Sequence, residues 1–329
     1  MNTGVVLVVG GAGYIGSHMV KYLREAGREV IVLDNLSSGH RDAVGGVPLA
    51  EGDMGERAVL EALFQRYPVE AVMHFAGSIE VAESVRDPGK YYRNNVAHTV
   101  ELLDAMVCHG VDQLIFSSTA AVYGEPSYTP IDESHPREPI NPYGRSKQMV
   151  EAILADYERA HGLRSVSLRY FNAAGADSEG DLAERHDPET HLIPIILEVA
   201  DGKRPHIAVY GRDYPTADGT CVRDYVHVQD LCRAHVLALD HLREGAASAA
   251  FNLGNGGGFS VQEVIDVARE VTGQPIAVVD EARREGDPAV LVADATAARE
   301  VLGWQPEHDL LEPIIEHAWK AGKSILYGS

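Results

Sequence analysis

Short apolar runs alternate with helical stretches along the first half of the sequence. The first run, Val5–Val9, is continuous and rich in β-branched residues, which is typical of a strand buried on both faces. Further strands are expected at residues 29–33, 47–50, 71–75, 113–116 and 165–169. Helices are expected between them at residues 14–26, 56–66, 88–109 and 143–161. Alternation on this scale predicts an α/β fold, with a parallel sheet and helices on both of its faces.

The pattern changes after Asn172. Residues 173–189 are rich in Gly, Asp and Glu and lack periodicity, and shorter helices are expected at residues 193–200, 261–272 and 310–321. We therefore predict a larger domain over residues 1–173 and a smaller C-terminal α/β substrate domain over residues 174–329. The boundary is soft, because segments near residues 222–245 can return to the first domain.

Composition restricts the classes of partner. The 329 residues carry a formal net charge of −21, which repels nucleic acid and anionic membranes. No apolar run approaches the roughly 20 residues that span a bilayer. The N-terminal Met1–Gly4 lacks the basic region of a signal peptide, and the three cysteines show no metal-ligand spacing. We expect a cytoplasmic protein without nucleic-acid or membrane partners and without a metal.

A glycine-rich turn follows the first strand. Gly10, Gly13 and Gly16 lie between this strand and the first helix, where backbone N–H groups can hold a pyrophosphate. Asp34 ends the second strand, 24 residues after Gly10, close to the roughly 20 expected for an acid that binds the adenosine ribose. Its carboxylate would repel a 2′-phosphate. These features predict a Rossmann-type, doubly wound parallel sheet that binds NAD rather than NADP.

A Tyr-x-x-x-Lys pair supplies candidate catalytic groups. Tyr143 and Lys147 share one face of a predicted helix, where the ammonium group can stabilise the phenolate and lower the tyrosine pKa. The phenolate can then exchange a proton with a substrate hydroxyl. Thr119 follows a predicted strand at the edge where ligands bind in open α/β sheets, and can hold the reacting oxygen. The set predicts redox chemistry on a hydroxyl group.

Motifs spread over nearly the whole chain carry a closer resemblance. They are residues 10–16, 34–36, 53–54, 75–77, 91–95, 117–124, 170–172, 213–219, 222–230 and 283–287. The glycine spacing and the Thr119, Tyr143 and Lys147 set are similar to the short-chain dehydrogenase/reductase superfamily. Together the motifs resemble the UDP-glucose 4-epimerase family.

The resemblance implies a mechanism and two sets of binding residues. Tyr143 takes the proton of the sugar 4-hydroxyl, a hydride moves from C4 to NAD, and the 4-keto sugar turns over before the hydride returns. The implied NAD-binding residues are Gly10, Gly13, Tyr14, Ile15, Gly16, Asp34, Asn35, Asp53, Met54, Phe75, Ala76, Gly77, Asn94, Lys147 and Tyr170. The implied UDP-sugar-binding residues are Thr119, Tyr143, Asn172, His191, Leu192, Ala208, Tyr210, Arg223, Leu291, Arg284 and Asp287. A homodimer through the helices at residues 88–109 and 143–161 is also implied.

Some positions depart from the family pattern. Thr119 replaces a serine, Ile79 and Glu80 replace a Leu-Lys pair of some members, and His191 replaces an asparagine. Leu291 aligns with the position that gates N-acetylated sugars, and its intermediate size leaves their acceptance open.

Three alternative functions follow from this pattern. A dTDP-glucose 4,6-dehydratase would need an Asp-Glu pair where Ala120 and Ala121 stand. A 4-epimerase acting on UDP-pentoses, UDP-uronates or UDP-N-acetylhexosamines would share the mechanism. A catalytically inactive nucleotide-binding regulator would not need the intact Thr119, Tyr143 and Lys147 set.

Overall fold

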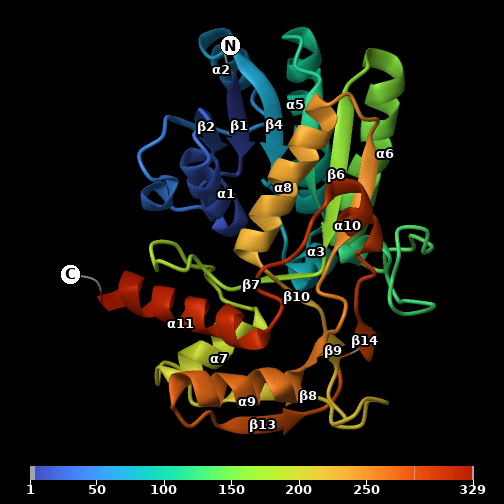
Figure 1. Cartoon of the computed structure of the whole chain (residues 1–329). Coiled ribbons are helices and arrows are strands. Elements are labelled where there is room, and N and C mark those ends of the chain that lie inside the picture. The colour runs from blue at the N-terminus through green and yellow to red at the C-terminus, as the bar shows by residue number, and fades with distance from the viewer. Residues whose placement is uncertain (1–3, 285, 328–329) are drawn as a thin grey trace.

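Seven parallel strands form the central sheet of the protein. The computed structural model describes residues 4–284 and 286–327, so Met1–Thr3 and Glu285 of the 283–287 motif lie outside the described residues. The strand order is β11-β6-β5-β4-β1-β2-β3 (Figure 1). The strands are β1 (Val5–Val9), β2 (Val30–Asp34), β3 (Leu49–Glu51), β4 (Val69–His74), β5 (Gln113–Thr119), β6 (Arg164–Tyr170) and β11 (Ala249–Leu253). The predicted α/β fold with a doubly wound parallel sheet is confirmed.

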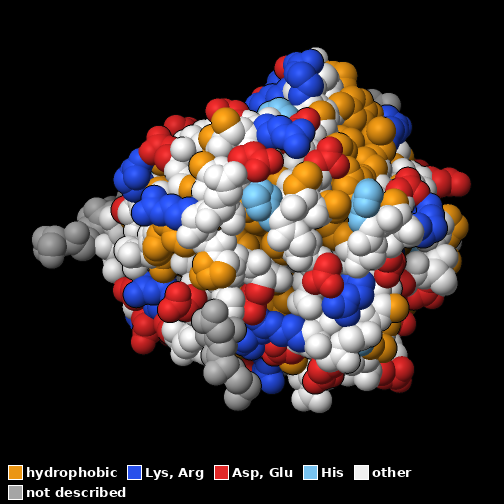
Figure 2. Space-filling view, turned by 90° about the horizontal axis from the view of Figure 1, so that it is seen from above, with side chains coloured by type: hydrophobic (Ala, Val, Ile, Leu, Met, Phe, Trp, Pro, Cys, Tyr) orange, Lys and Arg blue, Asp and Glu red, His pale blue; other side chains and the backbone are white. Residues whose placement is uncertain are grey.

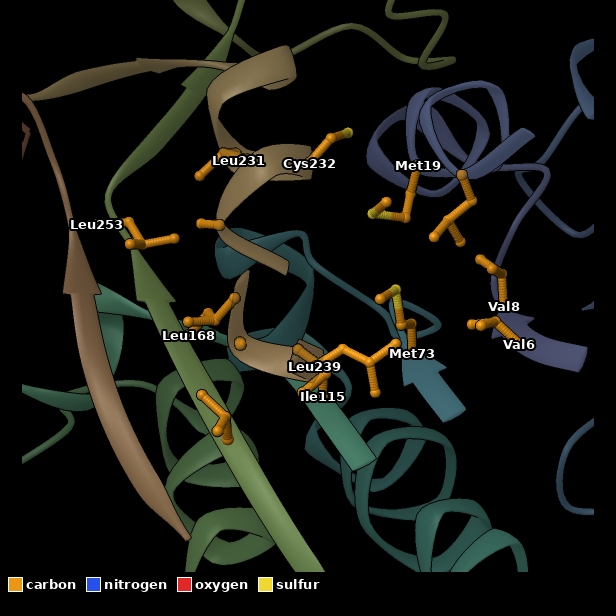
Figure 3. Packing of buried hydrophobic residues seen from close by; sticks show 14 of the residues in the cluster. Val6, Val8, Met19, Met73, Ile115, Leu168, Leu231, Cys232, Leu239 and Leu253 are labelled. Atoms are coloured by element: carbon orange, nitrogen blue, oxygen red, sulfur yellow. The ribbon is translucent and has the colours of Figure 1, made fainter. Parts of the chain in front are cut away.

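Helices cover both faces of the sheet. One face carries α1 (Tyr14–Glu25), α8 (Val228–Arg243) and α10 (Thr296–Leu302), and the other carries α2 (Arg57–Arg66), α5 (His98–Cys108) and α6 (Pro142–His161). Successive residues of a buried strand point to opposite faces, so Val6 and Val8 belong to the first core and Leu7 and Val9 to the second. Figure 3 shows Leu231 and Leu239 of α8 in the first core.

Segments from the second half of the chain complete this sheet. Helix α8 lies within the region where return segments were expected, and β11 and α10, further along the chain, also pack here. Strand β11 extends the sheet beyond β6, pairing Phe251 with Leu168. Residues from both sides of position 173 therefore contribute to the core of the central sheet.

The expected helix over residues 88–109 is interrupted. It consists of α4 (Pro88–Tyr91), a π-helical turn η2 (Tyr92–Ala97) and α5. A single wide turn leaves the apolar pattern on either side nearly unchanged, so periodicity predicted one continuous helix. Such turns are frequent at functional sites, and this one carries Asn94 and Asn95.

A third core lies beyond the carboxyl ends of the central strands. It contains α7 (Leu192–Ala200), α9 (Val261–Thr272) and α11 (Leu311–Tyr327), packed with β8 (Ile207–Tyr210) and β13 (Val278–Glu281). The remaining strands are β7 (Asn172–Ala174), β9 (Val222–Arg223), β10 (Tyr225–His227), β12 (Phe259–Ser260) and β14 (Val290–Leu291). The remaining helical turns are η1 (Arg41–Val44), α3 (Val81–Arg86) and η3 (Ala120–Val122). Figure 1 shows this lower part, with α11, α7, α9 and β13, beneath the central sheet.

The strand order fixes where a ligand can bind. Strand β1 lies between β2 and β4, so the strands that follow β1 in the chain are added first on one side of it and then on the other. Open α/β sheets bind ligands at such a point, outside the carboxyl ends of the strands. Gly10 follows β1, Phe75 follows β4, and Thr119 ends β5. The predicted cofactor and catalytic residues are therefore gathered at one edge of the sheet.

The surface carries charges of both signs. On the face in Figure 2, acidic and basic side chains are interspersed rather than separated into large areas of one sign. Within residues 4–284 and 286–327, no helix is both long and apolar enough to cross a membrane.

Candidate active site

The glycine turn is shaped by close backbone contacts. Gly10 has φ +81°, and a Cβ there would lie 2.5 Å from the Ala76 nitrogen. A Cβ at Gly16 would lie 2.1 Å from the Gly10 carbonyl oxygen, so both positions require glycine. At Gly13 a Cβ would meet only the Gly10 carbonyl, at 3.4 Å. The space in front of Gly13 is therefore open.

Helix α1 begins at this turn with free N–H groups. Its N-cap is Gly13, no side chain caps it, and no acid lies in its first turn. The backbone N–H groups of Tyr14, Ile15 and Gly16 have no acceptor within the helix, which creates an anion site. The Tyr14 side chain is used elsewhere, because its hydroxyl donates to the Gly175 carbonyl at 2.7 Å. Only the backbone of Tyr14 is therefore available to a ligand at the turn.

Asp34 is held rigidly beside the turn. Its carboxylate accepts hydrogen bonds from the N–H groups of Ala12, at 2.9 Å, and Leu36, at 2.8 Å. Next to it, the Asn35 amide donates to Asp53 at 2.8 Å. Met54 is buried directly after Asp53. These predicted residues form one group at the ends of β2 and β3.

Lys147 of α6 is buried under the edge of β5. Its ammonium group donates to the Ser117 carbonyl at 2.9 Å, and burial lowers the pKa of Lys147 to about 8. Burial raises the pKa of Tyr143, and a hydrogen bond with Thr119 opposes this in part. The expected lowering of the Tyr143 pKa by Lys147 is therefore wrong for the protein chain alone. The structure does bring Tyr143 and Thr119 into contact.

The loop after β4 approaches Lys147 from the other side. The N–H groups of Phe75 and Ala76 both donate to the Val9 carbonyl, at 2.8 and 3.0 Å. A Cβ at Gly77 would lie 3.3 Å from Asn95 Oδ1 and 3.5 Å from the Lys147 nitrogen, so the loop lies close to both side chains. The loop is therefore fixed between β1 and α6.

Two further predicted cofactor residues form hydrogen bonds around this loop. The Asn94 amide donates to the Ser78 hydroxyl at 3.2 Å. The Tyr170 hydroxyl, whose pKa is raised by burial, contacts the Ser117 hydroxyl. Ser117 thus contacts Tyr170 through its hydroxyl and Lys147 through its carbonyl.

Six predicted substrate residues lie on β8, on β9, on β14 and in the segment between β13 and β14. Arg223 of β9 forms an ion pair with Asp287 and donates to the Pro288 carbonyl at 2.9 Å. The Arg284 guanidinium lies 3.8 Å from the ring centroid of Tyr210. The pairing of β9 with β14 aligns Leu291 with Arg223. Ala208, on the same strand as Tyr210, pairs with Val279 of β13.

The other predicted substrate residues have different neighbours. His191 precedes α7, which begins at Leu192, and its Nδ1 contacts Glu184 at 2.8 Å and Glu189 at 2.9 Å. Burial alone would lower the pKa of His191, but these carboxylates raise it to about 10. Asn172 pairs with Tyr225 in the β7–β10 ladder. Among the described residues, no hydrogen bond joins His191 or Asn172 to the Arg223–Asp287 pair.

Comparison with known proteins decides the family. Residues 6–254 match the NAD dependent epimerase/dehydratase family. The chain belongs to this family. A UDP-glucose 4-epimerase of Halalkalibacterium halodurans is 51% identical over 323 residues, which cover 98% of this chain and 97% of that protein.

Solved structures of this family superpose on nearly the whole chain. The UDP-glucose 4-epimerase from Brucella ovis in complex with NAD has a TM-score of 0.94 and 51% identity, covering 96% of this chain and 97% of the other. The Bifidobacterium longum enzyme in complex with NAD⁺ and UDP has a TM-score of 0.92 and 38% identity, covering 99% and 100%.

The residues of this family member fit the dinucleotide that the family name implies. The open face of Gly13 and the unpaired N–H groups of α1 suit a pyrophosphate, which a Cβ would keep at a distance. The Asp34 carboxylate lies beside two N–H donors, where ribose hydroxyls can add further hydrogen bonds. Lys147 lies beyond the Gly77 loop, on the reactive side of the site.

Several positioning residues were missed by sequence reasoning. The buried Asn95 amide donates to the Ser78 carbonyl and to the Ser146 hydroxyl, each at 3.0 Å, and so ties the loop after β4 to α6. The buried Glu151 carboxylate accepts from Ser118 at 2.6 Å and from Arg169. A single polar residue within an apolar helix pattern is a weak signal of a buried hydrogen bond, because its partner can lie anywhere in the chain.

Proposed function

We propose that this protein interconverts UDP-galactose and UDP-glucose by epimerisation at C4, with NAD retained as the cofactor. The observation that carries the proposal is the contact of Tyr143 with Thr119, beside buried Lys147, at the edge of the sheet that also holds the glycine turn. The relatives named UDP-glucose 4-epimerase support the choice of sugar.

Tyr143 acts as the acid and base in this proposal. Its phenolate removes the proton of the sugar 4-hydroxyl, while the Thr119 hydroxyl donates to the same oxygen and fixes it in place. NAD, which the glycine turn and Asp34 would hold, would supply the acceptor for the C4 hydride and the donor for its return to the opposite face of the sugar. Because burial alone opposes the phenolate, Lys147 contributes its positive charge beside the reacting groups.

The uridine diphosphate is held on the opposite side of the site. Arg223 and Arg284 supply positive charge for the diphosphate, and Tyr210 supplies an aromatic surface for uracil. Asp287 accepts from Arg223 in the free protein and from the uridine ribose in the complex. An anchor remote from the sugar leaves the sugar ring free to turn over between the two hydride transfers.

The positions after Thr119 argue against a dehydratase. Ala120 and Ala121 begin the short turn η3, and neither offers an acid or base for elimination of water. A 4,6-dehydration would need both groups next to the sugar. The pair of alanines therefore favours epimerisation within the family.

We also propose a homodimer in the cytoplasm. Exposed apolar side chains near α3 and α6 support a protein interface, including Val85, Ile140 and Met149, which are 64%, 57% and 43% exposed. Cys108, Cys221 and Cys232 are free thiols, which a reducing compartment preserves. A monomer mass in light scattering would reject the dimer.

The experiment uses protein purified without added cofactor. UDP-galactose is added, UDP-glucose is followed by NMR, and Tyr143→Phe serves as the matched control because it removes only the reacting hydroxyl. Conversion without added NAD, absent in the control, is the expected result. If the protein contains NAD and UDP-galactose is not converted, the UDP-hexose assignment is wrong. UDP-N-acetylgalactosamine, UDP-pentoses and UDP-uronates would then be tested in the same way, and failure of all would favour an inactive regulator.

A further inference from the structure

Two clusters of acidic and basic side chains lie close together in the loop before α7. In the first, the Lys21 ammonium contacts Asp177 and Glu179 at 2.8 Å and Asp181 at 3.0 Å. A cation of the chain thus already occupies the centre of this cluster. The second consists of Glu184, His186, Glu189 and His191, whose ligand atoms all lie within 4.8 Å of one another; we call it the 184–191 cluster.

The distances in the 184–191 cluster suit a common centre. Nδ1 of His186 and Nδ1 of His191 lie 2.9 and 2.8 Å from the same oxygen of Glu184. The Glu189 carboxylate lies 2.9 Å from His191 and 3.9 Å from His186. A tetrahedral zinc ion with bonds of about 2.0–2.2 Å holds its ligand atoms about 3.3–3.5 Å apart. The observed separations span this range, so small side-chain movements would place all four atoms around one ion.

Burial and charge also favour a cation. The side chains of Glu184 and Glu189 are only 8% and 6% exposed, and both carboxylates face imidazoles. Without an ion, protonated imidazoles balance these carboxylates; one divalent ion would displace those protons, balance both carboxylates and leave both imidazoles neutral. Buried carboxylates are stable when they are paired or coordinate a metal.

We propose that Glu184, His186, Glu189 and His191 bind one divalent transition-metal ion, with Zn²⁺ as the best fit. Two imidazole nitrogens and two carboxylate oxygens suit Zn²⁺, whereas Ca²⁺ and Mg²⁺ prefer oxygen ligands alone. All four ligands come from eight consecutive residues, so the ion would close this segment on itself. This differs from the expectation that the chain binds no metal, which rested on cysteine spacing alone.

The metal site would brace the loop against the cofactor-binding side of the protein. His186 packs edge-on against the Tyr14 ring, with centroids 6.4 Å apart, and Tyr14 follows the glycine turn. The Arg185 carbonyl contacts the His40 ring at 3.0 Å, and the Thr190 hydroxyl contacts Glu80 at 3.2 Å. Metal binding through Nδ1 of His191 would also fix its tautomer and leave Nε2 as a donor. The ion would therefore order the entrance to α7 without taking part in the reaction.

The test measures metal content rather than activity. Tag-free protein is treated with a chelator, incubated with excess Zn²⁺, desalted and analysed by elemental mass spectrometry. The expected content is about one zinc per chain, with roughly tenfold or greater loss of binding in Glu184→Gln and in His186→Gln. Glu179→Gln is the matched control, because it changes the neighbouring cluster, whose centre is Lys21. Cys108→Ser tests for binding to the exposed thiol.

Wild-type protein provides a second readout that does not depend on a variant folding. Co²⁺ in the site should give the visible absorption bands of a tetrahedral ion, and Zn²⁺ should raise the Tm by preferential binding to the folded state. The proposal is overturned if wild-type protein takes up no more zinc than His186→Gln, or if Glu179→Gln loses as much as Glu184→Gln. Failure here would leave the proposed epimerase activity intact, because that activity is assayed independently.

Discussion

The cofactor side and the substrate side of the proposed active site are built from different contacts. On the cofactor side the backbone decides the shape: Gly16 has no room for a Cβ, and Asp34 accepts from two N–H groups. On the substrate side, pairs of side chains far apart in the sequence meet, such as Arg223 with Asp287 and Arg284 with Tyr210. The shape of the cofactor side therefore depends mainly on backbone geometry, and that of the substrate side depends on contacts between side chains distant in the sequence.

This difference has a functional consequence. A dinucleotide can enter a site whose N–H donors and ribose acceptor are already in place, which limits the entropy cost of binding and suits a cofactor that stays bound. In the proposed complex, the diphosphate would instead take Arg223 away from Asp287 within a chain of net charge −21. The proposed substrate side would therefore rearrange in each turnover, while the proposed cofactor side would keep its shape.

The largest effect is expected for Tyr143→Phe, which should reduce the rate of the reaction and leave cofactor binding unchanged. Tyr143→Phe should lower kcat by about 10²–10⁴-fold, because the proton has no acceptor of matching position. Bound NAD, measured by absorbance after denaturation, should remain at the wild-type level. A variant with nearly unchanged kcat would show that the base is misassigned, whatever its NAD content.

The buried charge of Lys147 should appear in the pH dependence of stability. The pKa of Lys147 is about 8 in the folded protein and 10.5 in the unfolded chain. Between pH 8 and pH 10.5 the unfolded chain therefore binds more protons than the folded protein, and the free energy of unfolding rises with pH. Lys147→Met lacks this rise. The variant's stability relative to wild type should therefore fall by about 3 kcal/mol as pH rises from below 8 to 10.5. Parallel denaturation curves of the two proteins across this window would contradict the assignment.

Removing a substrate-side charge should weaken substrate binding and leave the cofactor in place. Arg284→Gln should raise KM by roughly 10- to 100-fold, because a hydrogen bond to a charged group contributes about 1.5–3 kcal/mol. Arg212→Gln is the matched control, since this exposed arginine pairs with Asp280 and is outside the predicted substrate set. Equal KM values for the two variants would remove Arg284 from the phosphate site.

Substitutions of two glycines should distinguish an effect on folding from an effect on cofactor binding on the cofactor side. Gly16→Ala should destabilise the fold by about 1–3 kcal/mol, because its Cβ would overlap the Gly10 carbonyl. Gly13→Ala should unfold at nearly the wild-type denaturant concentration, because its Cβ has room, but should release NAD more readily on dilution. If Gly13→Ala retains NAD as well as wild type, the pyrophosphate does not lie in front of Gly13.

The same difference explains what the sequence could predict. The strands, the glycine turn and Asp34 were predictable because each depends on a local pattern: apolar runs, glycine spacing and position after a strand. The pairing of β11 with the central sheet and the π-helical turn at Asn95 were not predictable. The pairing partner of a strand and a single wide turn leave little trace in the spacing of apolar residues. The pKa of Tyr143 was predicted in the wrong direction, because sequence spacing gives proximity to Lys147 but not the depth of burial.

Side-chain networks between distant positions were equally inaccessible. Arg169 and Glu151 are 18 positions apart, and Tyr123 and Asn252 are 129 apart, yet hydrogen bonds connect all four. Arg169 links the two pairs, because it donates to both Glu151 and the Tyr123 hydroxyl. The family resemblance predicted Arg223 and Asp287 as separate substrate contacts, whereas the structure pairs them with each other.

In the proposed reaction, one retained NAD would take up the hydride from C4 of the sugar and the same hydride would return to that carbon. The most direct measurement uses UDP-galactose with deuterium at C4, incubated in ordinary water with protein that received no added NAD. NMR and mass spectrometry then show whether the UDP-glucose formed carries deuterium at C4. Full retention of the label at C4 is the predicted result. Loss of the label to solvent, or conversion only when NAD is supplied, would contradict hydride return by a retained cofactor.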